Sequence, residues 1–319
     1  MNAAVEVHQL VREFKGGIRA VDGLDLEVRD GEIYGFLGPN GAGKTTVVRI
    51  LTTLLRPTAG HARVAGHDVV GEGDAVRRAI GVALQEAAID PLMTGRELLR
   101  MQGALHGLRG GEARERAAAL LERVGLTEAA DRRVGGYSGG MRRRLDLALA
   151  LVHRPHVLFL DEPTTGLDPT SRAALWREVR ALHEDGTTVF LTTQYLEEAE
   201  QLADRVGIIA RGKLVAEGTP ESLKARVGEP TVHVEISDPQ RGRRACEALA
   251  GLGAVERPTE RAPTRIGVRT AAGRAAIAPI VRALDEAGVA VEFVEVESPT
   301  LDDVFMAVTG SHLEGAATA

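Results

Sequence analysis

The most informative stretch of this chain is Gly38-Pro39-Asn40-Gly41-Ala42-Gly43-Lys44-Thr45. It follows the apolar run Ile33–Leu37, which predicts a strand, and it opens a helical pattern over Lys44–Leu55. A glycine-rich loop between a strand and a helix lets successive N–H groups and the helix N-terminus point at a phosphate. We expect Lys44 to reach the β- and γ-phosphates of a nucleotide and the Thr45 hydroxyl to hold Mg²⁺. The predicted nucleotide-binding set therefore runs from Gly38 through Thr46.

A second motif supplies two carboxylates. The buried-strand run Val157–Leu160 ends in Asp161 and Glu162, and open α/β sheets place their ligands at the carboxyl ends of strands. We expect Asp161 to bind Mg²⁺ through water. Glu162 is the candidate base that orients or deprotonates an attacking water, because phosphoryl transfer otherwise needs mainly positioning and charge neutralisation.

Short apolar runs alternate with helical patterns along the first two thirds of the chain, which predicts an α/β fold with a parallel sheet. The expected strands are Ile33–Leu37, Val157–Leu160 and Thr188–Leu191, and the helices after them are Lys44–Leu55, Arg172–Leu182 and Leu196–Leu202. Between Gln85 and Ala150 the pattern is mostly helical, with a capping-box start at Thr94 and Glu97. This predicts a helical insert at about residues 86–150.

A domain boundary is expected near Gly228. Thr219-Pro220 predicts the start of a short helix to about Val227, and residues 229–310 then alternate between half-exposed strands and helices. We therefore expect a first domain over 1–227, a small α+β domain over 229–310, and a loose tail over 311–319. The expected strands of the small domain are Thr231–Ile236, Thr264–Val268 and Val289–Val296. Its expected helices are Arg241–Leu252, Ala271–Ala287 and a last one capped by Ser298-Pro299 that runs through Val308.

Composition limits the classes of function. With 319 residues, 44% of them hydrophobic, the chain can bury a sizeable core. Its net charge of −6 gives no general reason to bind nucleic acid, and we expect no nucleic-acid partner. Cys246 is the only cysteine, which fits a reducing compartment. No run approaches the roughly 18 apolar residues of a membrane span, and the N-terminus lacks the pattern of a signal peptide.

Tyr137-Ser138-Gly139-Gly140-Met141, followed by three arginines, lies a short distance before Asp161. Together with the two motifs above it resembles the signature of ATP-binding cassette (ABC) ATPases. That resemblance implies a P-loop NTPase fold and a homodimer in which two chains sandwich two ATP molecules. Ser138 and the amides of Gly139 and Gly140 would then contact the γ-phosphate held by the other copy. From the residues alone, this segment is a good anion-binding helix N-terminus, and a simple helix N-cap is the alternative.

Three further positions carry over from the cassette family. Phe14 falls where the family has an aromatic residue that stacks on adenine, although an isolated Phe is also a common core residue. Gln85 matches the glutamine that contacts Mg²⁺ and senses the transporter subunit. Asp168, in Gly166-Leu167-Asp168-Pro169, matches the loop that crosses the dimer, although the same segment alone is an ordinary turn.

The chain departs from the family at the switch position. Gln194, in Leu191-Thr192-Thr193-Gln194-Tyr195-Leu196, stands where the family usually has histidine. An amide can donate a hydrogen bond to the γ-phosphate but does not titrate near neutral pH. We therefore expect Gln194 to take part in hydrolysis, and we expect the rate of hydrolysis to show no pH dependence from a titrating imidazole. Met141 and Tyr137 also differ from the commoner glutamine and leucine of the signature.

The drug-export branch of the family, represented by daunorubicin-resistance ATPases, is similar over almost the whole chain. It shares Thr192–Leu196 and a C-terminal segment like Leu301–Phe305. The spacing of Leu301, Val304, Phe305 and Val308 equally predicts plain packing of one helical face. Likewise, Arg142–Arg144 with Arg132 and Arg133 could be a solvated face or a contact for a membrane partner or acidic headgroups.

The resemblance implies an ATPase subunit that uses ATP and Mg²⁺ and pairs with a second copy of itself. It would lie at the cytoplasmic face of the membrane and drive export of a hydrophobic drug or antibiotic through a separate permease. One alternative is a cassette protein acting on ribosomes or DNA, but such proteins usually carry two cassettes or long insertions. A P-loop kinase or GTPase is the other, and the signature segment argues against it.

Overall fold

The computed structural model describes residues 3–84, 89–259 and 262–310. Contacts between Cα atoms divide the chain into two compact units, whose main segments are residues 1–220 and 221–307. The division falls at the start of helix α8 (Pro220–Val227), whereas the boundary expected from sequence lies just after that helix.

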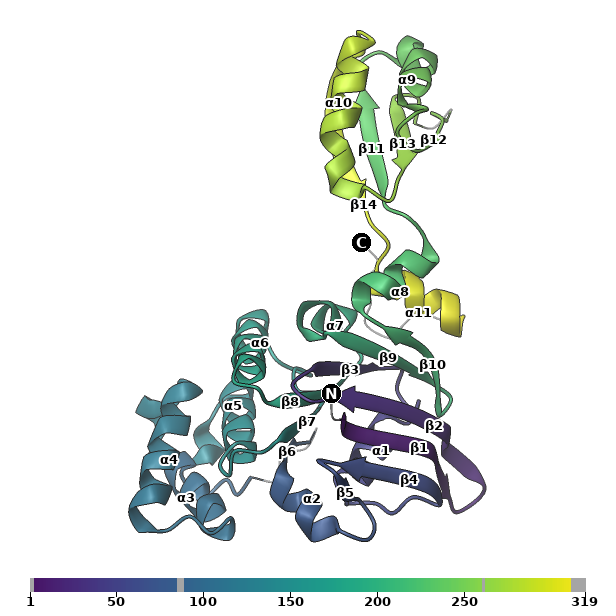
Figure 1. Cartoon of the computed structure of the whole chain (residues 1–319). Coiled ribbons are helices and arrows are strands. Elements are labelled where there is room, and N and C mark those ends of the chain that lie inside the picture. The colour runs from purple at the N-terminus through teal and green to yellow at the C-terminus, as the bar shows by residue number, and fades with distance from the viewer. Residues whose placement is uncertain (1–2, 85–88, 260–261, 311–319) are drawn as a thin grey trace. The chain divides into compact units, whose positions relative to one another are not determined.

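The first unit is built around a six-stranded sheet (Figure 1). Its strands run in the order β10 (Lys213–Gly218), β9 (Arg205–Ala210), β3 (Ile33–Leu37), β8 (Thr188–Thr193), β7 (Val157–Asp161) and β6 (Ile80–Ala83). Neighbours from β9 to β6 pair in parallel, and only β10 is antiparallel. Every residue of β3, β7 and β8 is buried. The prediction of a parallel α/β sheet is confirmed.

A second sheet in this unit has no counterpart in the sequence analysis. It is antiparallel, with the strand order β2 (Ile18–Arg29), β1 (Ala3–Phe14), β4 (Ala59–Val64) and β5 (His67–Asp68). The pairing of β1 with β2 shifts register between Val7 and Leu10, and Gln9 has a φ of 46°. Such a bulge interrupts the two-residue alternation by which a strand is recognised.

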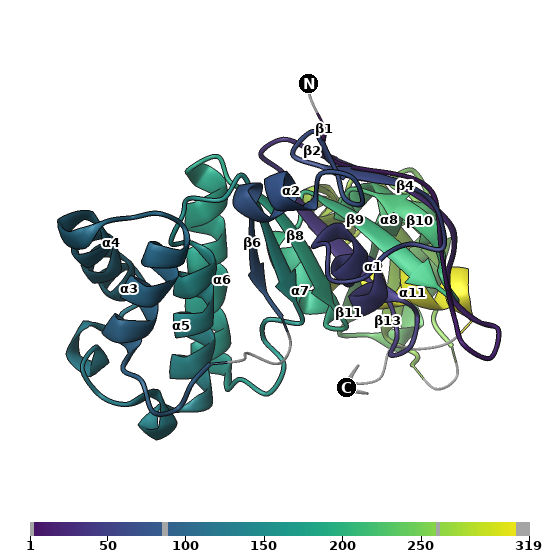
Figure 2. The ribbon, with the colours of Figure 1, turned by 90° about the horizontal axis from the view of Figure 1, so that it is seen from below.

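Before α8, the described residues of the first unit form the helices α1 (Lys44–Leu51), α2 (Gly73–Ala79), α3 (Gly95–Leu105), α4 (Gly110–Arg123), α5 (Gly139–Ala150), α6 (Pro169–Glu184) and α7 (Leu196–Leu202). Helix α3 begins with the predicted capping box of Thr94 and Glu97. Helices α3, α4 and α5 lie together beyond strand β6, and α1 lies on the other side of β6 and β8 (Figure 2). Among the described residues, no helix has both the length and the apolar composition needed to cross a membrane.

The second unit is a small α+β fold, as predicted. Its antiparallel sheet has the order β12 (Ala254–Glu256), β13 (Arg265–Arg269), β11 (Thr231–Ile236) and β14 (Val291–Glu297). Helices α9 (Gly242–Leu249) and α10 (Ile277–Glu286) pack against it and complete a separate core that includes Val234, Leu249 and Leu284.

The last helix, α11 (Leu301–Thr309), begins later than its predicted cap. Thr300 caps it, because Thr300 Oγ1 accepts from Asp303 N (3.2 Å) and Asp303 Oδ2 accepts from Thr300 N (2.8 Å). The predicted cap at Ser298-Pro299 is therefore wrong. Leu301 and Phe305 are buried, as packing of one helical face requires, whereas Val308 is exposed. The predicted tail over 311–319 lies outside the described residues.

Candidate site for nucleotide binding and hydrolysis

The loop between β3 and α1 has a shape that requires glycine. Gly43 has a φ of 111°, and a Cβ added there would lie 2.4 Å from the carbonyl oxygen of Ala20. A Cβ added at Gly38 would lie 2.5 Å from the carbonyl oxygen of Ile209. Gly43 is the N-cap of α1 and has no side chain to cap it, so a bound phosphate can take the place of the cap.

Lys44 and Glu162 form a buried ion pair at the start of α1. Lys44 Nζ lies 3.3 Å from Glu162 Oε1, and both side chains are almost fully buried. The same ammonium group donates to the carbonyl oxygens of Gly38 (2.7 Å) and Pro39 (3.3 Å). The structure thus brings the predicted phosphate-binding lysine and the predicted base together across 118 residues of sequence.

Asp161 and Thr45 offer oxygen ligands to a cation. Asp161 Oδ1 lies 3.5 Å from Thr45 Oγ1 and accepts from Thr192 Oγ1 at 2.5 Å. Asp161 Oδ2 is buried and has no hydrogen-bond partner among the described residues. A buried carboxylate oxygen left without a donor, next to a hydroxyl, fits Mg²⁺, which prefers oxygen ligands and often keeps several waters. The third predicted ligand, Gln85, lies outside the described residues.

The backbone holds Glu162 in an unusual conformation. Glu162 has a φ of 48°, in the left-handed region that costs a non-glycine residue energy and that clusters at functional sites. Its N–H donates to Thr192 O (3.0 Å) and Thr192 Oγ1 (3.2 Å). Thr192 therefore fixes both Asp161 and Glu162. No sequence motif points to this role of Thr192, although its place at the carboxyl end of a strand is a signal that could have done so.

The side chain of Arg143 is only 10% exposed and turns inward, so neither interpretation of the basic cluster holds for this residue. It donates to backbone carbonyl oxygens at Leu84 (2.5 Å), Asp161 (3.0 Å) and Pro163 (2.8 Å), and its guanidinium pairs with Asp146 at 3.2 Å. Burial lowers the pKa of Arg143, and Asp146 opposes that shift. Arg143 therefore ties helix α5 to the loop that carries Glu162.

The signature residues stand at the N-terminus of α5. Ser138 is the N-cap, and its Oγ accepts from Met141 N at 3.2 Å. Ser138 and Gly139 are exposed, and a Cβ added at Gly139 would meet open space. Gly140 instead packs so closely on Ser171 of α6 that a Cβ would lie 2.5 Å from its Oγ. Helices α5 and α1 lie on opposite sides of β6 and β8 (Figure 2).

The remaining predicted site residues occupy separate positions. Asp168 caps α6, accepting from Ser171 N (3.0 Å) and Ser171 Oγ (2.6 Å); these hydrogen bonds lower its pKa. Phe14 ends β1, is 39% exposed, and has the guanidinium of Arg12 4.7 Å from its ring centre. Gln194 is half-buried and directly follows β8.

Comparison with known proteins shows the family of the chain. The sequence pattern of the ABC transporter family matches residues 21–165, and that of the C-terminal domain of DrrA1-3-like ATP-binding proteins matches residues 218–309. The chain therefore belongs to the ATP-binding subunits of ABC transporters, and it is an ATPase whose hydrolysis of ATP is coupled to transport.

Within that class, the chain is similar to daunorubicin-resistance ATP-binding proteins over both units. It is 51% identical to DrrA3 of Streptomyces coeruleorubidus over 296 residues, covering 92% of each chain. It is 48% identical to the daunorubicin/doxorubicin resistance protein DrrA of Streptomyces peucetius over 307 residues, covering 96% of this chain and 92% of that one.

A solved structure with a similar fold is the dimeric, post-hydrolysis state of the ATP-binding cassette MJ0796 bound to ADP and Pi. The TM-score is 0.63 and the identity 27%, over 67% of this chain and 98% of that one.

Proposed function

We propose that two copies of this chain enclose two ATP molecules between the loop at Gly38–Thr45 of one copy and Ser138, Gly139 and Gly140 of the other. The observation that carries this proposal is the exposure of Ser138 and Gly139 on a helix separated from α1 by the sheet. A phosphate held at α1 can then meet this helix N-terminus only from a second copy. The dimeric MJ0796 structure with ADP and Pi supports the same arrangement.

In this proposal Lys44 binds the β- and γ-phosphates, and Glu162 accepts the proton of the attacking water. The phosphates draw Lys44 from Glu162, which frees the carboxylate to orient that water. Thr45, Asp161 and Gln85 would hold Mg²⁺, which supplies charge neutralisation for the phosphates. Gln194 donates a hydrogen bond to the γ-phosphate, Phe14 stacks on adenine, and Asp168 faces the second copy.

We further propose that the chain works at the cytoplasmic face of the membrane and drives export through a separately encoded permease. The names of its relatives support this, since they are ATP-binding proteins of resistance to daunorubicin, doxorubicin and linearmycin. The proposed cargo is accordingly a hydrophobic drug or antibiotic.

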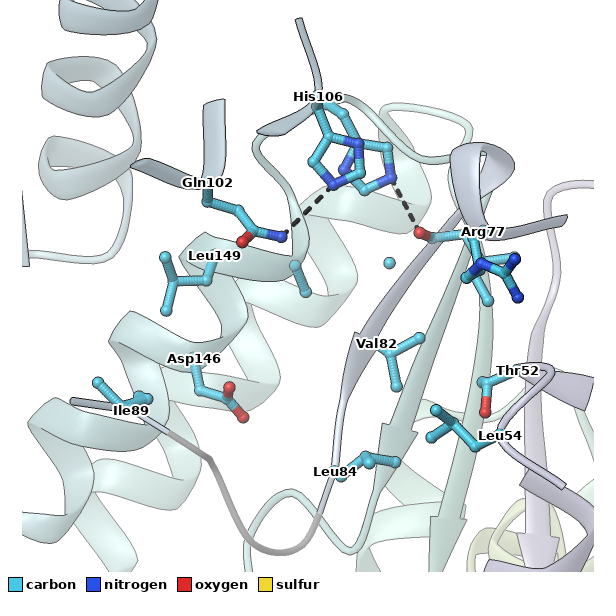
Figure 3. A pocket seen from close by; sticks show the side chains of 14 residues that line it. Thr52, Leu54, Arg77, Val82, Leu84, Ile89, Gln102, His106, Asp146 and Leu149 are labelled. Carbon is cyan, nitrogen blue, oxygen red and sulfur yellow. Dashed lines mark hydrogen bonds between the residues drawn. The ribbon is translucent and has the colours of Figure 1, made fainter. Parts of the chain in front are cut away.

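A cavity of about 470 Å³ is our candidate docking site for the permease. Figure 3 shows Gln102, Leu149 and Asp146 on one side and Val82 and Leu84 on the other. Leu84 and Ile89 both line it, and they border the segment that contains Gln85, the residue expected to sense the transporter subunit. Leu54, a further lining residue, is 60% exposed. We propose that an apolar segment of the permease occupies this cavity.

The ATP-sandwich proposal is tested with Glu162→Gln, which should bind Mg-ATP but not hydrolyse it, and so accumulate as a dimer. Adding Gly139→Arg should abolish that dimer and leave ATP binding intact, because Gly139 has open space around its Cβ position and lies on the proposed interface. Gly111→Arg is the matched control, since Gly111 is also exposed with open space at its Cβ position. The molar mass measured by light scattering distinguishes monomer from dimer for each variant.

A Glu162→Gln chain that stays monomeric in saturating Mg-ATP would remove the support for the sandwich. If Glu162→Gln dimerised to the same extent with and without Gly139→Arg, the interface between the two copies would not include Gly139.

The permease proposal is tested by purifying Glu162→Gln from detergent-solubilised cells with Mg-ATP. We expect a polytopic membrane protein to co-elute, and Leu54→Glu to reduce its recovery at least about tenfold through burial of a charge at the contact. Val215→Glu is the control, because Val215 is 41% exposed on β10, at the opposite edge of the sheet from β6. Recovery of ribosomes or nucleic-acid proteins, without a membrane protein, would favour the alternative cassette function.

A further inference from the structure

Glu198 is a carboxylic acid buried within helix α7. Its side chain is fully inaccessible, although Glu197 and Glu200 on the same helix are exposed. Burying a carboxyl group costs free energy, and an apolar side chain of similar volume would fill the space at lower cost. Packing alone therefore does not account for a glutamate at this position.

The polar neighbours of Glu198 come from three segments. Trp176 Nε1 of α6 donates to Glu198 Oε1 at 3.0 Å. Burial raises the pKa of Glu198, while the nearby polar side chains of Thr193, Trp176 and Thr164 lower it. Glu198 Oε2 and Thr164 Oγ1 are both buried and make no hydrogen bond within the described part of the chain.

Two of these neighbours, Thr193 and Thr164, belong to segments that carry proposed site residues. Thr193 Oγ1 accepts from Tyr195 N at 2.9 Å, and Gln194 is the residue between them. Thr164 follows Glu162 in the loop that ends at Asp168, and Thr164 O accepts from Leu167 N at 3.1 Å. In the same loop Thr165 Oγ1 donates to Glu162 Oε2 at 3.4 Å.

We infer that Glu198 is a positioning residue that joins the Gln194 segment to the loop from Glu162 to Asp168, so that contact of Gln194 with the γ-phosphate sets the position of Glu162 and Asp168. This inference rests on the proposed role of Gln194 at the γ-phosphate. It extends that role, because it names the buried group through which one loop acts on the other.

The test uses the full chain and four variants. Glu198→Leu removes the carboxyl group, whereas Glu198→Gln keeps an oxygen that can accept from Trp176. Thr164→Val replaces a buried hydroxyl without a hydrogen bond, so a purely structural role predicts unchanged or higher stability. Glu197→Gln is the matched control, because Glu197 is exposed on the same helix.

Two readouts separate positioning from folding. The first is kcat and KM for ATP. The second is the change in fluorescence of Trp176 on addition of Mg-ATP, which is specific because Trp176 is the single tryptophan of the chain. Affinity for a labelled ATP analogue and the thermal midpoint are measured beside them.

We expect Glu198→Leu to lower kcat about 10- to 100-fold, the effect of a catalytic group misplaced by about 1 Å, with KM and analogue affinity within about twofold. The response of Trp176 to Mg-ATP should disappear. Glu198→Gln should recover at least half of kcat, Thr164→Val should lower kcat without lowering the thermal midpoint, and Glu197→Gln should match the parent chain.

Parent-like kcat in both Glu198→Leu and Thr164→Val would overturn the inference. A purely structural role would give equal losses of kcat, nucleotide affinity and thermal midpoint in Glu198→Leu and Glu198→Gln and would leave Thr164→Val unaffected. That result would also overturn the inference. Failure of the underlying proposal gives a different result: Gln194→Ala would then hydrolyse ATP like the parent chain, whatever the behaviour of the Glu198 variants.

Discussion

In the proposed mechanism Gln194 is the switch residue, and its amide does not titrate in the neutral range. We predict that kcat of the chain shows no change from a titrating imidazole between about pH 6 and 8. Gln194→His should introduce such a change near the usual histidine pKa of about 6.5. We also expect the variant to hydrolyse ATP faster at pH 7.5, by about 2- to 10-fold, which corresponds to one hydrogen bond of about 0.5–1.5 kcal/mol. The measurement is steady-state phosphate release across that pH range.

The control for this experiment is Gln194→Ala, which removes the hydrogen-bond donor and should be slower than the parent chain at every pH. If Gln194→His kept both the rate and the pH profile of the parent chain, Gln194 would have no part at the γ-phosphate.

The sequence allows some individual candidate site residues to be predicted but not others. Lys44 and Glu162 could be proposed from the sequence because each belongs to a motif whose spacing has a chemical reason. Glu198 was missed because it stands among other glutamates, and the loops that it touches meet only in the folded chain. One signal was available: Glu198 lies four residues before Leu202, on the apolar side of α7.

Helix α5 carries a buried acid, Asp146, whose ionisation should be visible in the stability of the protein. Burial raises the pKa of Asp146 to about 6, and Arg143 opposes part of that shift. The folded pKa is above the unfolded value, so the folded chain holds an extra proton between about pH 4 and 6. The contribution of Asp146 to stability therefore falls as pH rises through that window.

We predict that Asp146→Asn, which keeps an acceptor for Arg143, removes this dependence. Relative to the parent chain, its free energy of unfolding should be higher at pH 7.5 than at pH 4.5 by about 2 kcal/mol, because most of the shift of about two pKa units lies between these two pH values. Urea unfolding at the two pH values measures the difference.

Asp131→Asn serves as the control, because the hydrogen bond with Arg96 lowers the pKa of Asp131. The contribution of Asp131 to stability is lost only below about pH 4, so the effect of Asp131→Asn should be nearly the same at the two pH values. A difference for Asp146→Asn that does not change between the two pH values would mean that Asp146 titrates normally in the folded chain.

The elements were predicted well where one physical pattern dominated. Strands Ile33–Leu37 and Thr231–Ile236 match β3 and β11 at both ends, since the first is a continuous buried run and the second alternates cleanly. The sheet of β1, β2, β4 and β5 was missed because its bulges break the alternation and because β1 pairs with β4, which is far from it in sequence. Strand pairing over such distances is a property of the fold and leaves no local pattern.

The whole molecule has an unequal distribution of aromatic residues. Its single tryptophan and its three tyrosines, Tyr34, Tyr137 and Tyr195, all lie in the first unit. The second unit has its own core. Tryptophan fluorescence therefore reports on the first unit alone, whereas far-ultraviolet circular dichroism reports on both.

We predict that Leu249→Ala, at a fully buried position of the second unit, destabilises that unit by about 2–5 kcal/mol. In urea, part of the circular dichroism transition should move to lower concentration while the Trp176 transition stays in place. Leu121→Ala, at a matched buried position of the first unit, should instead shift the Trp176 transition. A Trp176 transition that moves equally in both variants would show that the two units unfold together.

The ion pair of Lys44 and Glu162 has a consequence for selectivity. A solution rich in inorganic phosphate or sulfate offers many small anions to a bare lysine at a helix N-terminus, and each would act as an inhibitor. Here the lysine already has a carboxylate at 3.3 Å and two carbonyl oxygens as acceptors. An incoming anion must outcompete that carboxylate, which favours a polyphosphate with many contacts over a single weakly held ion. We therefore expect the resting subunit to bind such small anions weakly, and in the proposed mechanism the same carboxylate becomes the base once ATP has drawn Lys44 away from it.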